Sequence, residues 1–130
     1  MTSDELIQEF QSSAARDGSL HHIDHVRLGF ECLRQSTVLE AIGTFSNALR
    51  RFAADRGKPQ LYHETITWAY ILLIRERLAR TEAKDWEQFA QQNSDLLVWK
   101  GGVLSRYYQE ATLASDLART GFIFPDKCPS

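Results

Sequence analysis

Histidine is the residue type in this sequence best suited to chemistry, because its imidazole can bind a metal ion or exchange a proton near neutral pH. The chain contains four of them, His21, His22, His25 and His63. His22 and His25 are three residues apart, so on a helix they lie about one turn apart on the same side. We expect His21 at the solvated start of that helix. His63 is distant in sequence, so only the fold can bring it to the other two.

Three long helices are expected to position these side chains. The first begins with the histidine pair and carries an apolar residue every three or four positions, which is the spacing of one helical face. The second begins after Thr37, whose side chain can form a capping box with Glu40. It ends before Gly57, a residue that favours the turn after a helix. Each of these two helices therefore has one apolar face to bury.

The third long helix is expected from about Tyr62 to about Arg80. Its middle, residues 66–74, is apolar nearly all round, which is typical of a central helix covered on several sides. A buried strand would also be apolar there, but the charged, helix-forming residues 75–80 continue the segment without a turn signal. The other expected helices and turns cover residues 3–18, 85–92, 94–99, 103–108 and 115–119, and residues 122–125 are expected to pack back as an extended tail.

These elements predict an all-α fold, a single compact domain over residues 1–130 with about five helices and an extended C-terminal tail. Short connections favour antiparallel neighbours. If the three long helices run up, down and up, then the first and third begin at the same end of the bundle. We therefore expect His22, His25 and His63 to face a common space.

Three interpretations of this histidine cluster stay open. The first is a divalent transition metal (Zn, Cu, Fe or Ni) bound by His22, His25 and His63, with Glu64 able to complete the ligand shell. The second is a small anionic or polar ligand at the two helix starts, with a histidine acting as acid or base. The third is purely structural, because buried polar groups usually just satisfy hydrogen bonds. The ligand-binding candidates beside the histidines are Asp24, Tyr62, Glu64 and Thr65.

Composition restricts the possible partners. The apolar fraction of 43% and the charged fraction of 25% are normal for a globular protein. A net charge of -2 argues against a nucleic-acid partner and against a polybasic membrane-surface protein. No apolar run approaches the roughly 20 residues that span a bilayer. The polar N-terminus and two isolated cysteines lead us to expect a cytoplasmic protein with no disulfide framework.

Five short motifs follow one another along the chain: residues 24–28 (DHVRL), 62–67 (YHETIT), 106–108 (RYY), a spaced L-x-S-x-x-A-R over 113–119 and the Pro-Asp pair at 125–126. Together they resemble a family of small uncharacterised bacterial all-helical proteins. The resemblance covers the chain from about Leu20 onward and implies an all-α fold and a bacterial source. His22, Asp24, His25, Tyr62, His63 and Glu64 fall on positions of its patterns. His21 departs from them, since a capping hydroxyl is expected there.

The resemblance implies no activity, so the function is predicted from the cluster alone. We expect a pocket that binds a metal or a small molecule, or that is catalytic, at the shared end of two helices. The alternative is a protein–protein interaction or structural module in which exposed aromatic or arginine side chains contact a partner.

Overall fold

The computed structural model describes residues 5, 22–99 and 102–127. All regular structure in these residues is helical, which confirms the all-α prediction. The predicted helix over residues 3–18 lies, apart from Glu5, outside the described residues, as does His21. The α-helices are α2 (His22–Gln35), α3 (Val38–Asp55), α4 (Glu64–Arg80), α5 (Trp86–Gln92), α6 (Glu110–Leu113) and α7 (Asp116–Thr120), with 3-10 turns at η1 (Pro59–Leu61), η2 (Ser94–Leu97) and η3 (Val103–Arg106).

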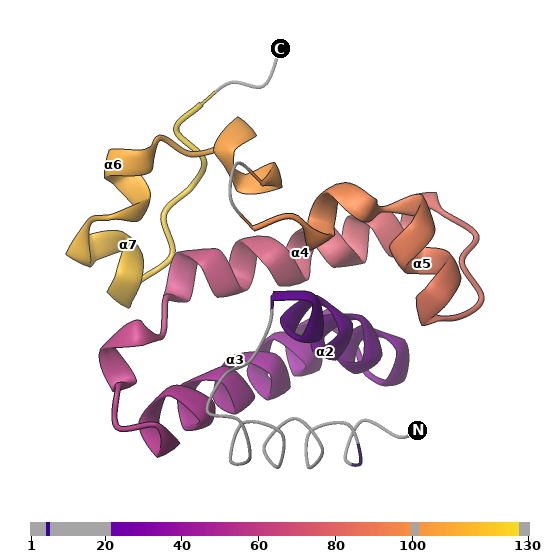
Figure 1. Ribbon diagram of the computed structural model, residues 1–130, viewed down its shortest axis with the longest axis horizontal. Coiled ribbons are helices and arrows are strands. Elements are labelled where there is room, and N and C mark those ends of the chain that lie inside the picture. The colour runs from indigo at the N-terminus through magenta and orange to yellow at the C-terminus, as the bar shows by residue number, and fades with distance from the viewer. Residues whose placement is uncertain (1–4, 6–21, 100–101, 128–130) are drawn as a thin grey trace.

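Helix α4 is the central element of the fold. Figure 1 shows it crossing the middle of the molecule, with α2 and α3 on one side and the later, shorter helices on the other. It contacts α2 and α3 and, near its start, α7. A helix that is covered in this way needs apolar residues on several faces, and the apolar run over residues 66–74 supplies them.

The start and end of α3 follow the sequence signals closely. The Thr37 side chain accepts a hydrogen bond from the backbone N–H of Glu40 at 3.3 Å. The Glu40 carboxylate accepts one from the backbone N–H of Thr37 at 3.4 Å, so the predicted capping box is confirmed. After the helix, Gly57 adopts a φ of +71°. This left-handed conformation is favourable only for glycine, and it turns the chain toward α4.

Helix α4 begins later than predicted. The expected start near Tyr62 is wrong, because the 3-10 turn η1 and the extended backbone of Tyr62 precede the helix, and the first helical residue is Glu64. His63 is the N-cap of α4, with extended backbone and a side chain that accepts a hydrogen bond from the backbone N–H of Ile66. This position determines much of what His63 can do.

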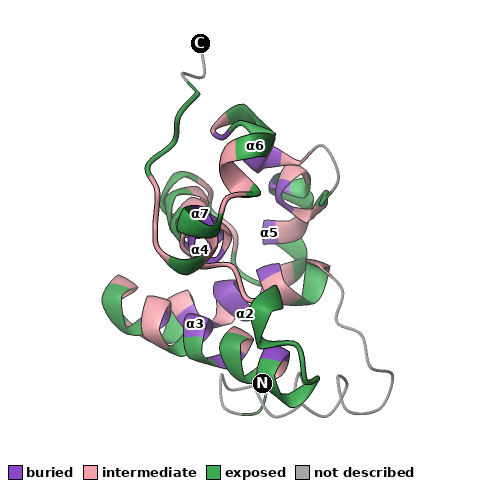
Figure 2. Cartoon of the chain, turned by 90° about the vertical axis from the view of Figure 1, so that its left-hand side faces the viewer, coloured by how far each residue is buried: buried purple, intermediate pink, exposed green. Residues whose placement is uncertain are grey.

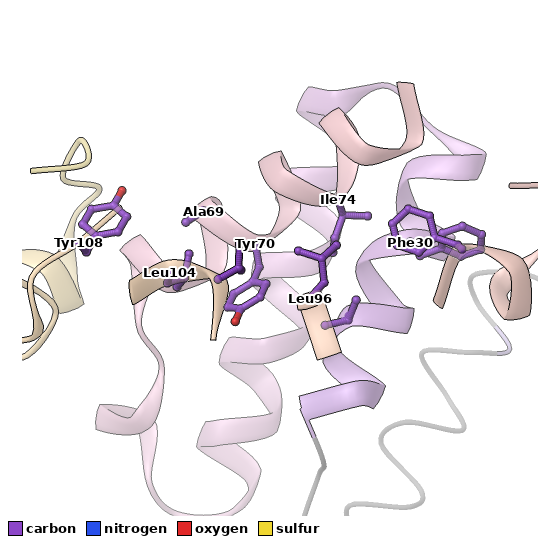
Figure 3. Packing of buried hydrophobic residues seen from close by; sticks show 10 residues of the cluster. Phe30, Ala69, Tyr70, Ile74, Leu96, Leu104 and Tyr108 are labelled. Carbon is purple, nitrogen blue, oxygen red and sulfur yellow. The ribbon is translucent and has the colours of Figure 1, made fainter. Parts of the chain in front are cut away.

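Helix α2 is packed on two sides. Val26 and Phe30 belong to a buried cluster that follows α4 toward α5 and the C-terminal segments (Figure 3). Leu28 and Cys32 belong to a second cluster shared with α3. Between these faces lies Gly29, where an added Cβ would be 2.9 Å from Cδ1 of Ile74. The missing side chain is what allows α2 to approach α4 so closely.

The C-terminal tail packs back on α4, as expected. The Phe122 ring stacks on Trp68 with ring centroids 5.4 Å apart, and the Tyr108 hydroxyl donates to the Ile123 carbonyl at 2.6 Å. In Figure 2, residues coloured as buried concentrate where the elements face one another, and the tail runs along the outside. No helix in the described ranges has both the length and the apolar composition that crossing a membrane requires.

Candidate functional site

A cavity of about 440 Å³ lies between α2, α3 and α4. The structure brings His22, His25 and His63 together on its wall, so residue 63 does lie at the same end of the fold as residues 22 and 25. Tyr62 lines the cavity as well. A volume of this size suits a small organic molecule, since such pockets are typically about 300–1,000 Å³. The described residues around it are His22, His25, Val26, Phe45, Leu49, Phe52, Ala53, Arg56, Leu61, Tyr62, His63, Ile66, Thr67, Tyr70 and Trp99.

Both ring nitrogens of His63 are used in hydrogen bonds to the backbone. Nδ1 accepts from the N–H of Ile66 at 3.1 Å, which caps α4. Nε2 lies 2.7 Å from the carbonyl oxygen of Leu113, to which it must donate. An accepting Nδ1 and a donating Nε2 define one neutral tautomer of the ring. The lone pair that a metal ion or a proton transfer would need is therefore already occupied.

His22 is tied to the C-terminal half of the chain. Its Nε2 donates to the Leu96 carbonyl at 2.8 Å. Its ring packs against those of Tyr70 and Trp99, with centroid distances of 4.8 and 5.1 Å. Burial lowers the pKa of His22, and the hydrogen bond to Leu96 opposes that shift only in part. The start of α2 is thus anchored through an imidazole in an aromatic environment.

Of the three described histidines, His25 is the one most affected by burial. Its ring lies 6.4 Å from that of Phe52 in an edge-on arrangement. Desolvation, with a smaller contribution from His22, lowers the pKa of His25 to about 4. The imidazole is therefore neutral at physiological pH. His25 therefore contributes a polar but uncharged side chain to the cavity wall.

Glu64 does not line the cavity, and its carboxylate is already engaged. It accepts hydrogen bonds from Tyr62 (2.6 Å), Arg50 (2.7 Å) and Trp68 (2.9 Å). The Arg50 guanidinium also lies over the Tyr62 ring, 4.8 Å from its centroid. Burial first, and then the hydrogen bond to Glu64, raise the pKa of Tyr62 to about 12. These contacts hold Tyr62 in place as a neutral part of the wall.

The other two predicted ligand-binding residues also lie off the cavity. Asp24 is exposed on α2. Thr65 is fully buried, and its hydroxyl donates to the Gly121 carbonyl at 2.8 Å and accepts from the N–H of Ile123 at 3.1 Å. Thr65 therefore attaches the C-terminal tail to α4.

The metal interpretation finds little support in this geometry. Within residues 22–99 and 102–127, no group of three or more His, Cys, Asp or Glu side chains is arranged to hold a metal ion. Two of the three histidines use Nε2 for a backbone carbonyl, and the nearest predicted carboxylate is held by three donors. The metal site stays a prediction.

Several lining residues were not predicted from the sequence, among them Tyr70, Trp99 and Arg56. Tyr70 could have been found, because it lies seven residues after His63 and so on the same face of α4. Burial, and to a smaller extent the charge of Asp95, raise the pKa of Tyr70 to about 12, so its hydroxyl is neutral. Trp99 and Arg56 lie beyond the ends of helices, where periodicity gives no direction for a side chain.

Comparison of the chain with protein-family models, with curated proteins and with solved structures finds no match. The family resemblance described above therefore stays a prediction. What can be said of function rests on the cavity itself.

Proposed function

We propose that this domain binds a small, largely apolar molecule in the cavity between α2, α3 and α4. The observation that carries the proposal is a cavity of about 440 Å³ with a mainly apolar lining, in which burial lowers the pKa of His25 to about 4 and so keeps its ring neutral. A pocket that combines apolar walls with a few oriented polar groups is the usual form of a ligand site.

The apolar part of the lining comes from all three long helices. Val26, Phe45, Leu49 and Ile66 present side chains from α2, α3 and α4. Displacing water from such walls is favourable by about 25 cal/mol per Å² of apolar surface that a ligand covers. The main source of affinity is therefore the body of the ligand rather than a bond to one atom.

The polar groups of the lining are suited to orienting a ligand. The hydroxyl of Thr67 is taken up by the His63 carbonyl at 2.7 Å, and that of Tyr62 by Glu64. Tyr70 adds a phenol for which the structure shows no hydrogen bond within the described residues. A ligand oxygen could accept a hydrogen bond from it. Because His63 lacks a free lone pair, this arrangement favours binding over acid–base catalysis.

The alternative from sequence, an interaction module, has weaker support. Among the described residues, the most exposed large apolar side chains are Leu39, Leu61, Leu117 and Phe124. They come from four different elements, α3, η1, α7 and the tail, and single exposed apolar residues are normal on protein surfaces.

Filling the cavity tests the proposal. Ala53 lines it and is 6% exposed, whereas its neighbour Ala54 is exposed on the same helix. We expect wild type to bind the neutral fluorescent probe N-phenyl-1-naphthylamine. Ala53→Phe should weaken that binding at least about tenfold, which is about 1.4 kcal/mol, while the matched control Ala54→Phe should leave it unchanged.

Circular dichroism would first establish that both variants are folded. Leu49→Trp fills the cavity from another position, and it replaces Ala53→Phe if that variant unfolds. The proposal is overturned if the probe does not bind the wild-type chain, or if the filled and control variants bind it equally well.

A further inference from the structure

We infer that the ligand of this cavity is an apolar molecule with a single negative charge, such as a carboxylate, and that Arg56 binds that charge at the rim. The inference rests on the proposed function and extends it from apolar ligands in general to apolar monoanions.

The charges around the cavity are unequal. Among its described lining residues there is no Asp or Glu, and Arg56 is the one side chain with a permanent charge. His25 is neutral at physiological pH because its pKa is about 4, and burial also lowers that of His22. From the described lining residues, a ligand therefore meets one fixed positive charge and no carboxylate.

Arg56 is positioned to use that charge. It is the C-cap of α3, and its guanidinium lies over the Phe52 ring, 5.5 Å from the ring centroid. Stacking on an aromatic ring restricts a guanidinium without using its N–H donors. Phe52 is itself part of the lining, so the stack holds the cation beside the apolar interior.

Two arginines of the neighbouring part of α3 and of α4, Arg50 and Arg77, are already paired. Arg50, two turns earlier on α3, forms an ion pair with Glu64 at 2.7 Å. Arg77, on α4, forms one with Asp95 at 2.6 Å. No ion pair of Arg56 is found among the described residues. Its planar fork matches the two oxygens of a carboxylate, so a carboxylate ligand would supply the missing partner.

A monoanion fits this site better than a phosphate dianion. Only one permanent cation is found among the lining residues that the structure describes. At the start of α4, the Ile66 N–H is already used, because His63 accepts its hydrogen bond. The inference places the anion beside Arg56, at the end of α3, and not at the two helix starts considered from the sequence. The apolar body of the ligand would lie inside and its charged group at the rim.

Two probes with the same aromatic skeleton separate charge from apolar binding. 8-Anilinonaphthalene-1-sulfonate carries one negative charge, and N-phenyl-1-naphthylamine lacks it. In titrations of the full chain, Arg56→Gln should lower the affinity for the anionic probe about tenfold, as expected for a lost charged hydrogen bond. It should change the affinity for the neutral probe less than twofold. Arg51→Gln, an exposed arginine of α3 that does not line the cavity, is the matched control and should change neither.

Salt provides a second readout. Because Arg56 is exposed, raising the ionic strength should lower the affinity of wild type for the anionic probe, and it should have less effect on the affinity of Arg56→Gln. An equal loss of both probes in Arg56→Gln would show that Arg56 only supports the pocket wall, and no loss of either would show that it does not contact the ligand. Each result overturns the inference and leaves the pocket intact. If neither probe binds wild type, the proposed function fails, and the inference fails with it.

Discussion

Replacing His63 tests whether this residue serves the fold through two backbone hydrogen bonds. His63→Ala removes both the cap on the Ile66 N–H and the donor to the Leu113 carbonyl. His63→Asn keeps a side chain that can cap α4, because asparagine is among the best N-cap residues. Its shorter side chain cannot also reach Leu113. The two variants therefore separate one hydrogen bond from the other.

The magnitudes follow from the two contacts. Loss of an N-cap costs about 1 kcal/mol. Loss of the donor leaves the Leu113 carbonyl without its 2.7 Å partner, which costs about 1–3 kcal/mol for a group that is partly shielded from water. We therefore expect His63→Ala to lower the free energy of unfolding by about 2–4 kcal/mol. His63→Asn should recover about 1 kcal/mol of this loss.

Urea unfolding followed by far-ultraviolet circular dichroism, extrapolated linearly to water, measures both values. Titration with the neutral probe gives an independent readout of the cavity, and the folded Asn variant should keep most of its affinity. The structural role is refuted if His63→Ala changes stability by less than about 0.5 kcal/mol, which is below the smallest expected cap effect. Equal stability of the Ala and Asn variants would refute the capping part alone.

Two further predictions concern pH and packing. Because the pKa of His25 falls from 6.5 to about 4 on folding, the unfolded chain binds more protons between these two pH values, and the free energy of unfolding should fall by up to about 3 kcal/mol as the pH drops through that window. Urea unfolding measured from pH 7.5 to 4.5 should show a shallower fall in His25→Gln than in wild type, and an identical dependence of stability on pH in the two proteins would contradict the assignment. Gly43→Ala, where an added Cβ meets nothing within 4 Å, should stabilise α3 by about 1 kcal/mol. Gly29→Ala should give a free energy of unfolding about 1–3 kcal/mol lower than that of Gly43→Ala, because the added Cβ would overpack against Ile74. Equal effects of the two substitutions would show that α2 can shift away from α4.

The elements that could be predicted from sequence are those defined by local interactions. The Thr37–Glu40 capping box involves residues three apart, and both side chains are found where the pattern places them. Asp85 and Ser115 likewise accept hydrogen bonds from backbone N–H groups three residues later and start α5 and α7. Apolar periodicity identified α2 and α3 for the same reason, since a helical face repeats within a few residues.

The features that were missed either have no local signal in the sequence or depend on distant parts of the chain. The four-residue helix α6 has no side-chain cap and no buried residue, so neither a capping motif nor an apolar face marks it in the sequence. The role of His63 as an N-cap was missed because histidine is not among the residues favoured at that position. Its second partner, Leu113, is 50 residues away. Neither the residue types nor their spacing in the sequence predicts a hydrogen bond between such distant residues.

The same reasoning explains why the histidine cluster was located more easily than it was interpreted. Short helices leave their last carbonyl groups without partners inside the helix. Leu96 belongs to η2 and Leu113 is the last residue of α6, and His22 and His63 donate to these two carbonyls. The two imidazoles therefore connect the starts of α2 and α4 to the C-terminal half of the chain. A wall whose polar atoms are satisfied in this way presents mainly apolar surface to the cavity. For this reason we expect the charge of a ligand to be recognised by Arg56 at the rim and not by the histidines inside.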